Sequence, residues 1–153
     1  MTVTADVLTG VAQLIASAGI ATWNPAGTYT VSQTGILMKI MADGTGVPDR
    51  VVVLNLVPLT DEISNPLGRS MLQVAGRGLR NQPLDVDALM DPIFDLLHGR
   101  TGDMFGSVTV VQMFRTSSVP MGEDALTRSE RADKFYLDIA AAPTALRPVG
   151  GSW

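Results

Sequence analysis

RSMLQVAGRG (residues 69–78) is followed by LDVDALMDPIFDLLHGR (84–100), GSVTVVQMFRTSS (106–118), GEDALTRSERAD (122–133) and KFYLDIAA (134–141). Residues 69–78 alternate between apolar and polar side chains, which is typical of a β-strand. Residues 84–98 place apolar side chains at helical spacing, and residues 108–114 and 135–142 are again β-like. This order of strand, helix, strand and strand predicts a mixed α/β domain.

The first half of the chain adds one helix and one strong strand. Residues 4–18 carry an apolar stripe at helical spacing, with Thr4 as the expected N-cap and Gly19 just past the expected end. Residues 20–34 predict a loop that holds at most a short strand at residues 29–31, and residues 35–41 are β-like. Residues 50–57 form a nearly continuous β-branched run, typical of a strand covered on both faces. Pro58 either ends that strand or places its end at a sheet edge.

We therefore expect one α/β (α+β mixed) domain over residues 1–142. Its sheet should be mixed and mostly antiparallel, with two main helices packed on it and a long β-hairpin loop. The strands at residues 50–57, 69–78, 108–114 and 135–142 should share that sheet. Residues 143–153 are rich in Pro and Gly and predict a loosely held C-terminal tail, in which Trp153 is the one large side chain that could dock.

Composition limits the classes of function. A chain of 153 residues has the length of one domain, and it contains no Cys and a single His, which excludes disulfides, thiolate metal sites and multi-histidine sites. The net charge of −4 argues against tight DNA binding, which usually needs a basic face. Only 17% of the residues are charged, which suits a protein that hides surface in an oligomer. No apolar run is long enough to span a membrane.

A regular carboxylate stripe and the single histidine lie in the second predicted helix. Asp87, Asp91 and Asp95 recur every fourth residue. They could bind Mg²⁺ or Ca²⁺, but such a helix face is more often simply solvated. His98 could be a general base, but a histidine also suits the C-terminal end of a helix dipole. We favour the structural interpretation of both features and expect no metal site.

Two further motifs are weak signals for chemistry. Gly76-Arg77-Gly78-Leu79-Arg80 resembles part of a glycine-rich phosphate loop, but it lacks the full dinucleotide spacing, and no GK[ST] occurs in the chain. We expect instead a strand-to-helix turn that places Arg77 and Arg80 at a subunit boundary. The serines at positions 117, 118 and 129 have no partnered His, which argues against nucleophilic catalysis. The sequence thus predicts no catalytic residue, no cofactor and no enzymatic activity.

The strongest interface candidate is the expected hairpin loop at residues 120–133. It is longer than the 2–5 residues that most hairpin loops need. Its charges of both signs allow two interpretations: a solvated tip, or a contact arm whose arginines pair with carboxylates across a subunit contact. The candidate interface residues of this loop are Met121, Glu123, Asp124, Arg128, Glu130, Arg131 and Asp133.

Several short phrases resemble a known family. The strand that ends in Arg77-Gly78, the Asp-rich helix that ends in Leu-Leu-His-Gly (residues 96–99), and the run from Gly122 through RSERAD (128–133) to FYLD (135–138) are similar to tail-terminator and minor capsid (tail-completion) proteins of long-tailed bacteriophages. The resemblance covers residues 69–142 well and residues 1–68 only by the order of their elements. Pro92 and the apolar segment at residues 36–41 depart from it.

The resemblance implies a virion protein that is assembled in the host cytoplasm. Its subunits would form a hexameric ring at the head-proximal end of the tail, stop growth of the tail tube, and dock the head-tail connector or stopper protein. The major tail tube protein would be the other partner, and DNA would pass through the lumen without specific binding. Two alternatives stay open: a head-completion or connector protein, and a small ligand-binding or enzymatic domain.

Overall fold

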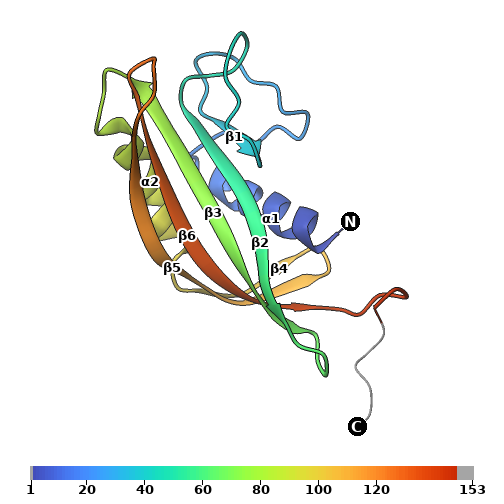
Figure 1. Cartoon of the computed structure of the whole chain (residues 1–153). Helices are drawn as coiled ribbons and strands as arrows, with labels where there is room; N and C mark the ends of the chain where they lie inside the picture. The colour runs from blue at the N-terminus through green and yellow to red at the C-terminus, as the bar shows by residue number, and fades with distance from the viewer. Residues whose placement is uncertain (1, 148–153) are drawn as a thin grey trace.

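The computed structural model describes residues 2–147 and contains, within them, two helices and one six-stranded sheet (Figure 1). The sheet order is β1-β2-β3-β6-β5-β4. The elements are α1 (Val3–Ser17), β1 (Gly35–Met38), β2 (Val51–Asp61), β3 (Leu67–Arg80), α2 (Asp85–Leu97), β4 (Arg100–Phe105), β5 (Val108–Glu123) and β6 (Arg128–Ala141). Within residues 2–147, no helix has the length and hydropathy of a membrane span.

The sheet confirms the predicted fold class. The four strands predicted to share one sheet lie within β2, β3, β5 and β6, which are neighbours and antiparallel to one another. Only β1 is parallel, and it pairs with β2 over four residues. The sheet is therefore mixed and mostly antiparallel. Strand β4 was not predicted, because RTGDMF contains Gly and Asp and shows no strand-like alternation.

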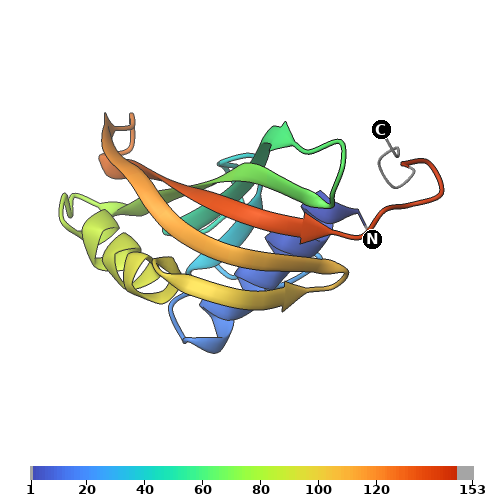
Figure 2. The ribbon, with the colours of Figure 1, turned by 90° about the horizontal axis from the view of Figure 1, so that it is seen from below.

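Both helices pack against one face of the sheet, which curls around them (Figure 2). Their apolar stripes meet the alternate residues of the strands that point the same way, as the period of two along a strand requires. The core residues of the helices include Val7, Leu8, Val11, Ile15, Val86, Leu89, Met90, Ile93 and Leu97. Those of the strands include Val52, Leu54, Leu72, Val74, Met113, Phe135, Leu137 and Ile139.

The glycines in the GRG motif allow α2 to lie close to β3. A Cβ at Gly76 would lie 2.6 Å from Met90 Sδ, and a Cβ at Gly78 would lie 2.8 Å from the backbone nitrogen of Val86. Neither position has room for a side chain without a shift of the helix. The motif therefore serves helix packing on the sheet.

Helix α1 begins earlier than predicted. Thr2, and not Thr4, is the N-cap, and its Oγ1 accepts a hydrogen bond from the Ala5 N–H at 3.2 Å. Asp6 in the first turn is buried and accepts hydrogen bonds from the backbone N–H and the hydroxyl of Ser107. Helix α2 agrees with its prediction to within one residue at each end, and Pro92 lies inside it.

Strand β2 passes through Pro58 and continues to Asp61. Because β1 pairs only with residues 51–54 of β2, Pro58 lies on a free edge, where its missing N–H costs no ladder hydrogen bond. The edge interpretation of Pro58 is confirmed, and the interpretation that it ends the strand is wrong. Residues 29–31 form no strand, and Tyr29 instead donates a 2.6 Å hydrogen bond from its hydroxyl to the Ile36 carbonyl.

The predicted long hairpin loop at residues 120–133 is wrong, because most of it is strand. Strand β5 runs to Glu123 and β6 begins at Arg128, so the turn consists of residues 124–127. The pairing shifts register between Val110 and Gln112, between Arg115 and Ser117, and between Pro120 and Gly122. Such β-bulges interrupt the alternation from which a strand is recognised in a sequence.

The predicted C-terminal tail follows the last strand of the sheet. Strand β6 ends at Ala141, and residues 142–147 are exposed. The prediction about Trp153 lies outside the described residues.

The burial of β2 generates the first prediction. Val53 is 5% exposed and Val57, four residues further along the same strand, is 37% exposed. An unpaired charge at a buried position is strongly disfavoured. We expect Val53→Asp to lower the free energy of unfolding by about 2–4 kcal/mol and Val57→Asp by about 0.5 kcal/mol. Urea denaturation measures both, and equal losses would contradict the placement of Val53.

Candidate functional site

Three buried arginines lie at one end of the sheet, near the β5–β6 turn. Arg77 is 2% exposed, Arg128 is 1% exposed and Arg131 is 8% exposed. All three belong to the phrases that carry the sequence resemblance. Burial of a guanidinium group is costly unless oxygen atoms surround it, so the partners of each arginine decide what this end of the molecule can do.

Arg128 is held by three carboxylates from two distant parts of the chain. Its Nε donates to Asp124 at 2.8 Å, its Nη1 to Asp49 at 2.9 Å, and its Nη2 to Asp43 at 2.8 Å. Burial opposes the charge, but the hydrogen bonds to Asp43, Asp124 and Asp49 outweigh it and raise the pKa of Arg128. The residue thus ties the hairpin turn to the segment between β1 and β2.

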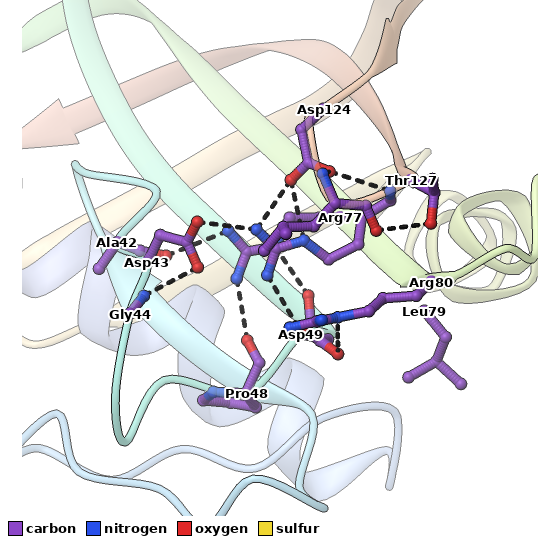
Figure 3. Close-up of polar contacts among 12 residues, drawn as sticks. Ala42, Asp43, Gly44, Pro48, Asp49, Arg77, Leu79, Arg80, Asp124 and Thr127 are labelled. Carbon is purple, nitrogen blue, oxygen red and sulfur yellow. Dashed lines mark hydrogen bonds and ion pairs between the residues drawn. The ribbon is translucent and has the colours of Figure 1, made fainter.

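Arg77 fastens the same segment through its backbone (Figure 3). It donates to the carbonyl oxygens of Asp49 at 2.7 Å, Pro48 at 2.9 Å and Ala42 at 3.1 Å. Burial and then the nearby charge of Arg128 lower the pKa of Arg77. Three carbonyl dipoles therefore replace a carboxylate here, and Arg77 acts as a clamp on residues 42–49.

Arg80 completes this network at the surface. Its guanidinium holds Asp49 with two hydrogen bonds of 2.9 and 3.2 Å (Figure 3). The hydrogen bond from Arg80 is the main reason that the pKa of Asp49 lies below its ordinary value. The pKa of Asp43 is lowered chiefly by its hydrogen bond from Arg128. Burial alone would raise the pKa of Asp124, but hydrogen bonds from the backbone and side chain of Arg128 lower it.

Arg131 forms a second network, which joins β6 to α2. Its Nε and Nη2 hold Asp133 at 2.9 and 3.0 Å, and its Nη1 donates to Asp87 at 3.0 Å and Asp91 at 2.7 Å. The hydrogen bond to Asp133 is the largest cause of the raised pKa of Arg131. Asp133 is also buried and accepts a hydrogen bond from the Ser118 hydroxyl at 2.6 Å.

These contacts change the role of the residues predicted to form a contact arm. Arg77, Arg128, Arg131 and Asp133 are buried, and Asp124 is bound to Arg128, so all five hold the molecule together. The expectation that the arginines of this segment are free to pair with a neighbouring subunit is wrong. Of the predicted interface residues, those with side chains still open to the surface are Arg80, Met121, Glu123 and Glu130.

The other candidates take structural positions. Asp87 and Asp91 bind Arg131, while Asp95 is exposed. Within residues 2–147, no three His, Asp or Glu side chains lie close enough to hold a metal ion. His98 follows α2, stacks on Phe94 and accepts a hydrogen bond at its Nδ1 from the Arg115 backbone N–H at 3.0 Å.

A cavity of about 480 Å³ lies between α2 and the β5–β6 hairpin. Its wall includes the Arg131 network, Ser118 and the exposed Glu123. The Ser118 hydroxyl donates to Asp133 and accepts from Arg131 at 2.9 Å. That hydroxyl is oriented by charged partners and not by a general base, so the arrangement stabilises the hairpin and offers no activated nucleophile.

The sheet face away from the helices, which we call the outer face, is the second candidate site. Residues directly opposite one another on neighbouring strands share a face, and the pairing arranges this face in rows across four strands. Two rows are apolar and flank a polar one, and a further polar row, formed by Thr60, Arg69, Asp138 and Gln112, lies beyond them. The apolar rows are Val57, Met71, Tyr136 and Phe114, and Val53, Ala75, Ala132 and Val119; the polar row between them is Asn55, Gln73, Lys134 and Ser117.

An arginine and two aromatic rings reinforce one end of the outer face. Arg69 lies 5.6 Å from the ring centre of Phe114 and 5.2 Å from that of Tyr136. It also holds Asp138 with two hydrogen bonds of 2.7 and 3.1 Å. This site was not predicted from the sequence. The alternation of KFYLDIAA, with Lys134, Tyr136 and Asp138 on one face of β6, was the available signal.

No family model matches the sequence, and no curated protein is significantly similar to it. The fold, the two arginine networks and the outer face are therefore the structural basis for a functional hypothesis.

The Arg128 network predicts a distinct dependence on pH. Asp43, Asp49 and Asp124 have pKa values held below the ordinary 3.8, so they stabilise the fold above that value. This stability is lost as the pH falls through the lowered folded pKa values. We expect the free energy of unfolding to be level from neutrality to about pH 5 and to fall steeply below about pH 4.

Arg128→Met should lower the free energy of unfolding at neutral pH by about 2–3 kcal/mol, less than a fully buried pair would cost, because its carboxylates are partly exposed. It should also make the acid-induced loss shallower. Arg147→Met is the matched control, since within residues 2–147 the Arg147 guanidinium donates to the carbonyl oxygens of Ala141 and Ala142 and to no carboxylate. Denaturation series from pH 3 to 7 compare the three proteins, and parallel curves for Arg128→Met and wild type would refute the role of the network.

Proposed function

We propose that this chain is a structural virion protein, the tail terminator of a long-tailed bacteriophage. Its subunits form a hexameric ring on the head-proximal end of the tail tube. The ring stops polymerisation of the major tail tube protein and offers a docking surface for the head-tail connector or stopper protein. DNA passes through the lumen without specific binding, and the protein has no enzymatic activity. Assembly takes place in the host cytoplasm, and the mature location is the virion.

The observation that carries this proposal is the outer face. An antiparallel sheet with one face in water normally presents polar side chains there. Here two rows across β2, β3, β6 and β5 are apolar, and the polar row between them holds one charged residue, Lys134. In the polar row beyond them, Arg69 and Asp138 pair with each other. Val57 and Val119, one from each apolar row, are exposed, whereas Val53 and Ala132 are already buried within the chain. Exposed apolar side chains on neighbouring rows of a sheet are typical of a surface that a partner covers. A subunit of a permanent ring needs such a surface.

Two further observations support it. The phrases that resemble phage tail-terminator proteins coincide with the buried Arg77, Arg128 and Arg131, so a physical requirement of this fold explains why those residues occur there. The net charge of −4 suits a conduit, because a lumen that gripped phosphates would hinder DNA passage.

A head-completion or connector protein is the alternative within the same particle, and it shares the fold and the outer face. A small ligand-binding or enzymatic domain is favoured by the cavity of about 480 Å³ beside Arg131. Its lining contains an excess of carboxylates, so a cationic ligand would be the first to test. Isothermal titration of such ligands against wild type and Asp91→Asn separates this alternative from an assembly role.

Deletion of the gene tests the proposal directly. Without a terminator, tube growth is not stopped, so electron microscopy of the lysate should show abnormally long tails, and a plasmid copy should restore normal length. Filled heads beside separate tails of normal length would indicate the connector role. Unaffected virions would refute both.

A further inference from the structure

The arm formed by residues 59–67, at the junction of β2 and β3, extends beyond one end of the sheet (Figure 1). Leu59, Ile63 and Leu67 on this arm are exposed. Asp61 and Glu62 are exposed as well, and neither forms an ion pair with any residue in the range 2–147. The arm thus combines apolar contact surface with two unpaired negative charges.

The polar row between the two apolar rows of the outer face carries the opposite charge. It contains Lys134, which has no carboxylate partner within the described part of the chain. Across that same part of the chain, every arginine is bound to a carboxylate or to backbone carbonyl oxygens, which leaves Lys134 and Lys39 as the cationic side chains without an oxygen partner. Lys134 also lies between two apolar rows, where a carboxylate flanked by apolar side chains would fit.

The arm and Lys134 cannot meet within one molecule. Asp61 lies opposite Gly68 on β3, and Gly68 lies opposite Ile139 on β6. Ile139 and Lys134 are five residues apart along β6, which is about 17 Å at roughly 3.4 Å per residue. A salt bridge requires a separation of about 4 Å, so only another molecule can bring these charges together.

We propose that the β2–β3 arm of one copy docks on the outer face of a second copy. Asp61 and Glu62 then lie beside Lys134 of the neighbouring copy, and Leu59 and Ile63 cover its apolar rows. This inference rests on the proposed ring and specifies which surfaces of neighbouring copies form it. Because the arm and the outer face are different surfaces, the contact is heterologous: each copy offers an arm to one neighbour and a face to the other, which closes into a ring when the rotation fits.

Charge reversal tests the contact in the purified full-length chain. The self-association of wild type, Lys134→Glu, Asp61→Lys/Glu62→Lys and the combination of all three substitutions is measured by light scattering over a concentration series. We expect Lys134→Glu and the arm variant each to weaken association by about tenfold or more, because each places like charges together. The combination should restore association. Asp95→Lys is the matched control and should leave association unchanged, because it changes an exposed carboxylate on α2 that forms no ion pair within residues 2–147.

Cross-linking provides a second measurement that does not depend on affinity. The chain contains no Cys, so an Asp61→Cys/Lys134→Cys variant carries the only two thiols. Their separation of about 17 Å within one chain excludes an internal disulfide, which needs Cα atoms within about 7 Å. Mild oxidation or a short bis-maleimide should therefore produce a ladder of covalent multimers, whereas Asp95→Cys/Lys134→Cys should not.

The outcomes separate this inference from the proposed function. The arm contact is refuted if charge reversal does not weaken self-association, or if the combined variant does not associate again. Long tails in the deletion lysate would still support a terminator in either case. The inference is also overturned if the wild-type chain stays monomeric and binds purified tail tubes through the outer face, and the Asp61→Cys/Lys134→Cys variant forms no covalent ladder. If tails in the deletion lysate are normal and the combined charge-reversal variant associates again, the contact between copies is supported and the terminator proposal is refuted.

Discussion

Three guanidinium groups are buried at one end of the sheet, and the shape of that end depends on how their charge is compensated. Arg128 gathers carboxylates from the turn after β5 and from the segment before β2, and Arg77 binds the carbonyl oxygens of that same segment. Arg131 joins β6 to α2 in the same way. Removal of any one arginine would leave several oxygen atoms without a donor, so the three must be accommodated together.

This arrangement gives the molecule two ends of different character. Near the turn between β5 and β6, the arginines and carboxylates form ion pairs with one another within the chain. This end of the surface therefore carries little unpaired charge despite its many ionisable residues. At the other end, the β2–β3 arm keeps its carboxylates and its apolar side chains exposed. The outer face between the two ends is largely apolar. A subunit with such polarity is suited to repeated contacts in one direction around a ring.

The predictable part of the fold is the part where side chains follow a regular period. Strand β2 was recognised from its nearly continuous β-branched run, and α2 from the helical spacing of its apolar stripe. The second half of β5 was not, because it contains Pro120 and Gly122 and two register shifts break its alternation. The same failure made Arg128 and Arg131 look like exposed loop residues. Their partners, such as Asp43 and Asp87, are far away in the sequence, and no local pattern reveals such a contact.

Pro58 has a consequence for the behaviour of the chain in a crowded cell. Beyond its pairing with β1, strand β2 has a free edge whose unpaired backbone groups could pair with another extended polypeptide. Pro58 lies on this edge and has no backbone N–H to donate to such a strand. On the opposite border, the Arg115 amide is already engaged by His98, and the bulges of β5 twist the remainder of that strand. The chain can therefore carry apolar rows on its surface while resisting growth into cross-β fibres.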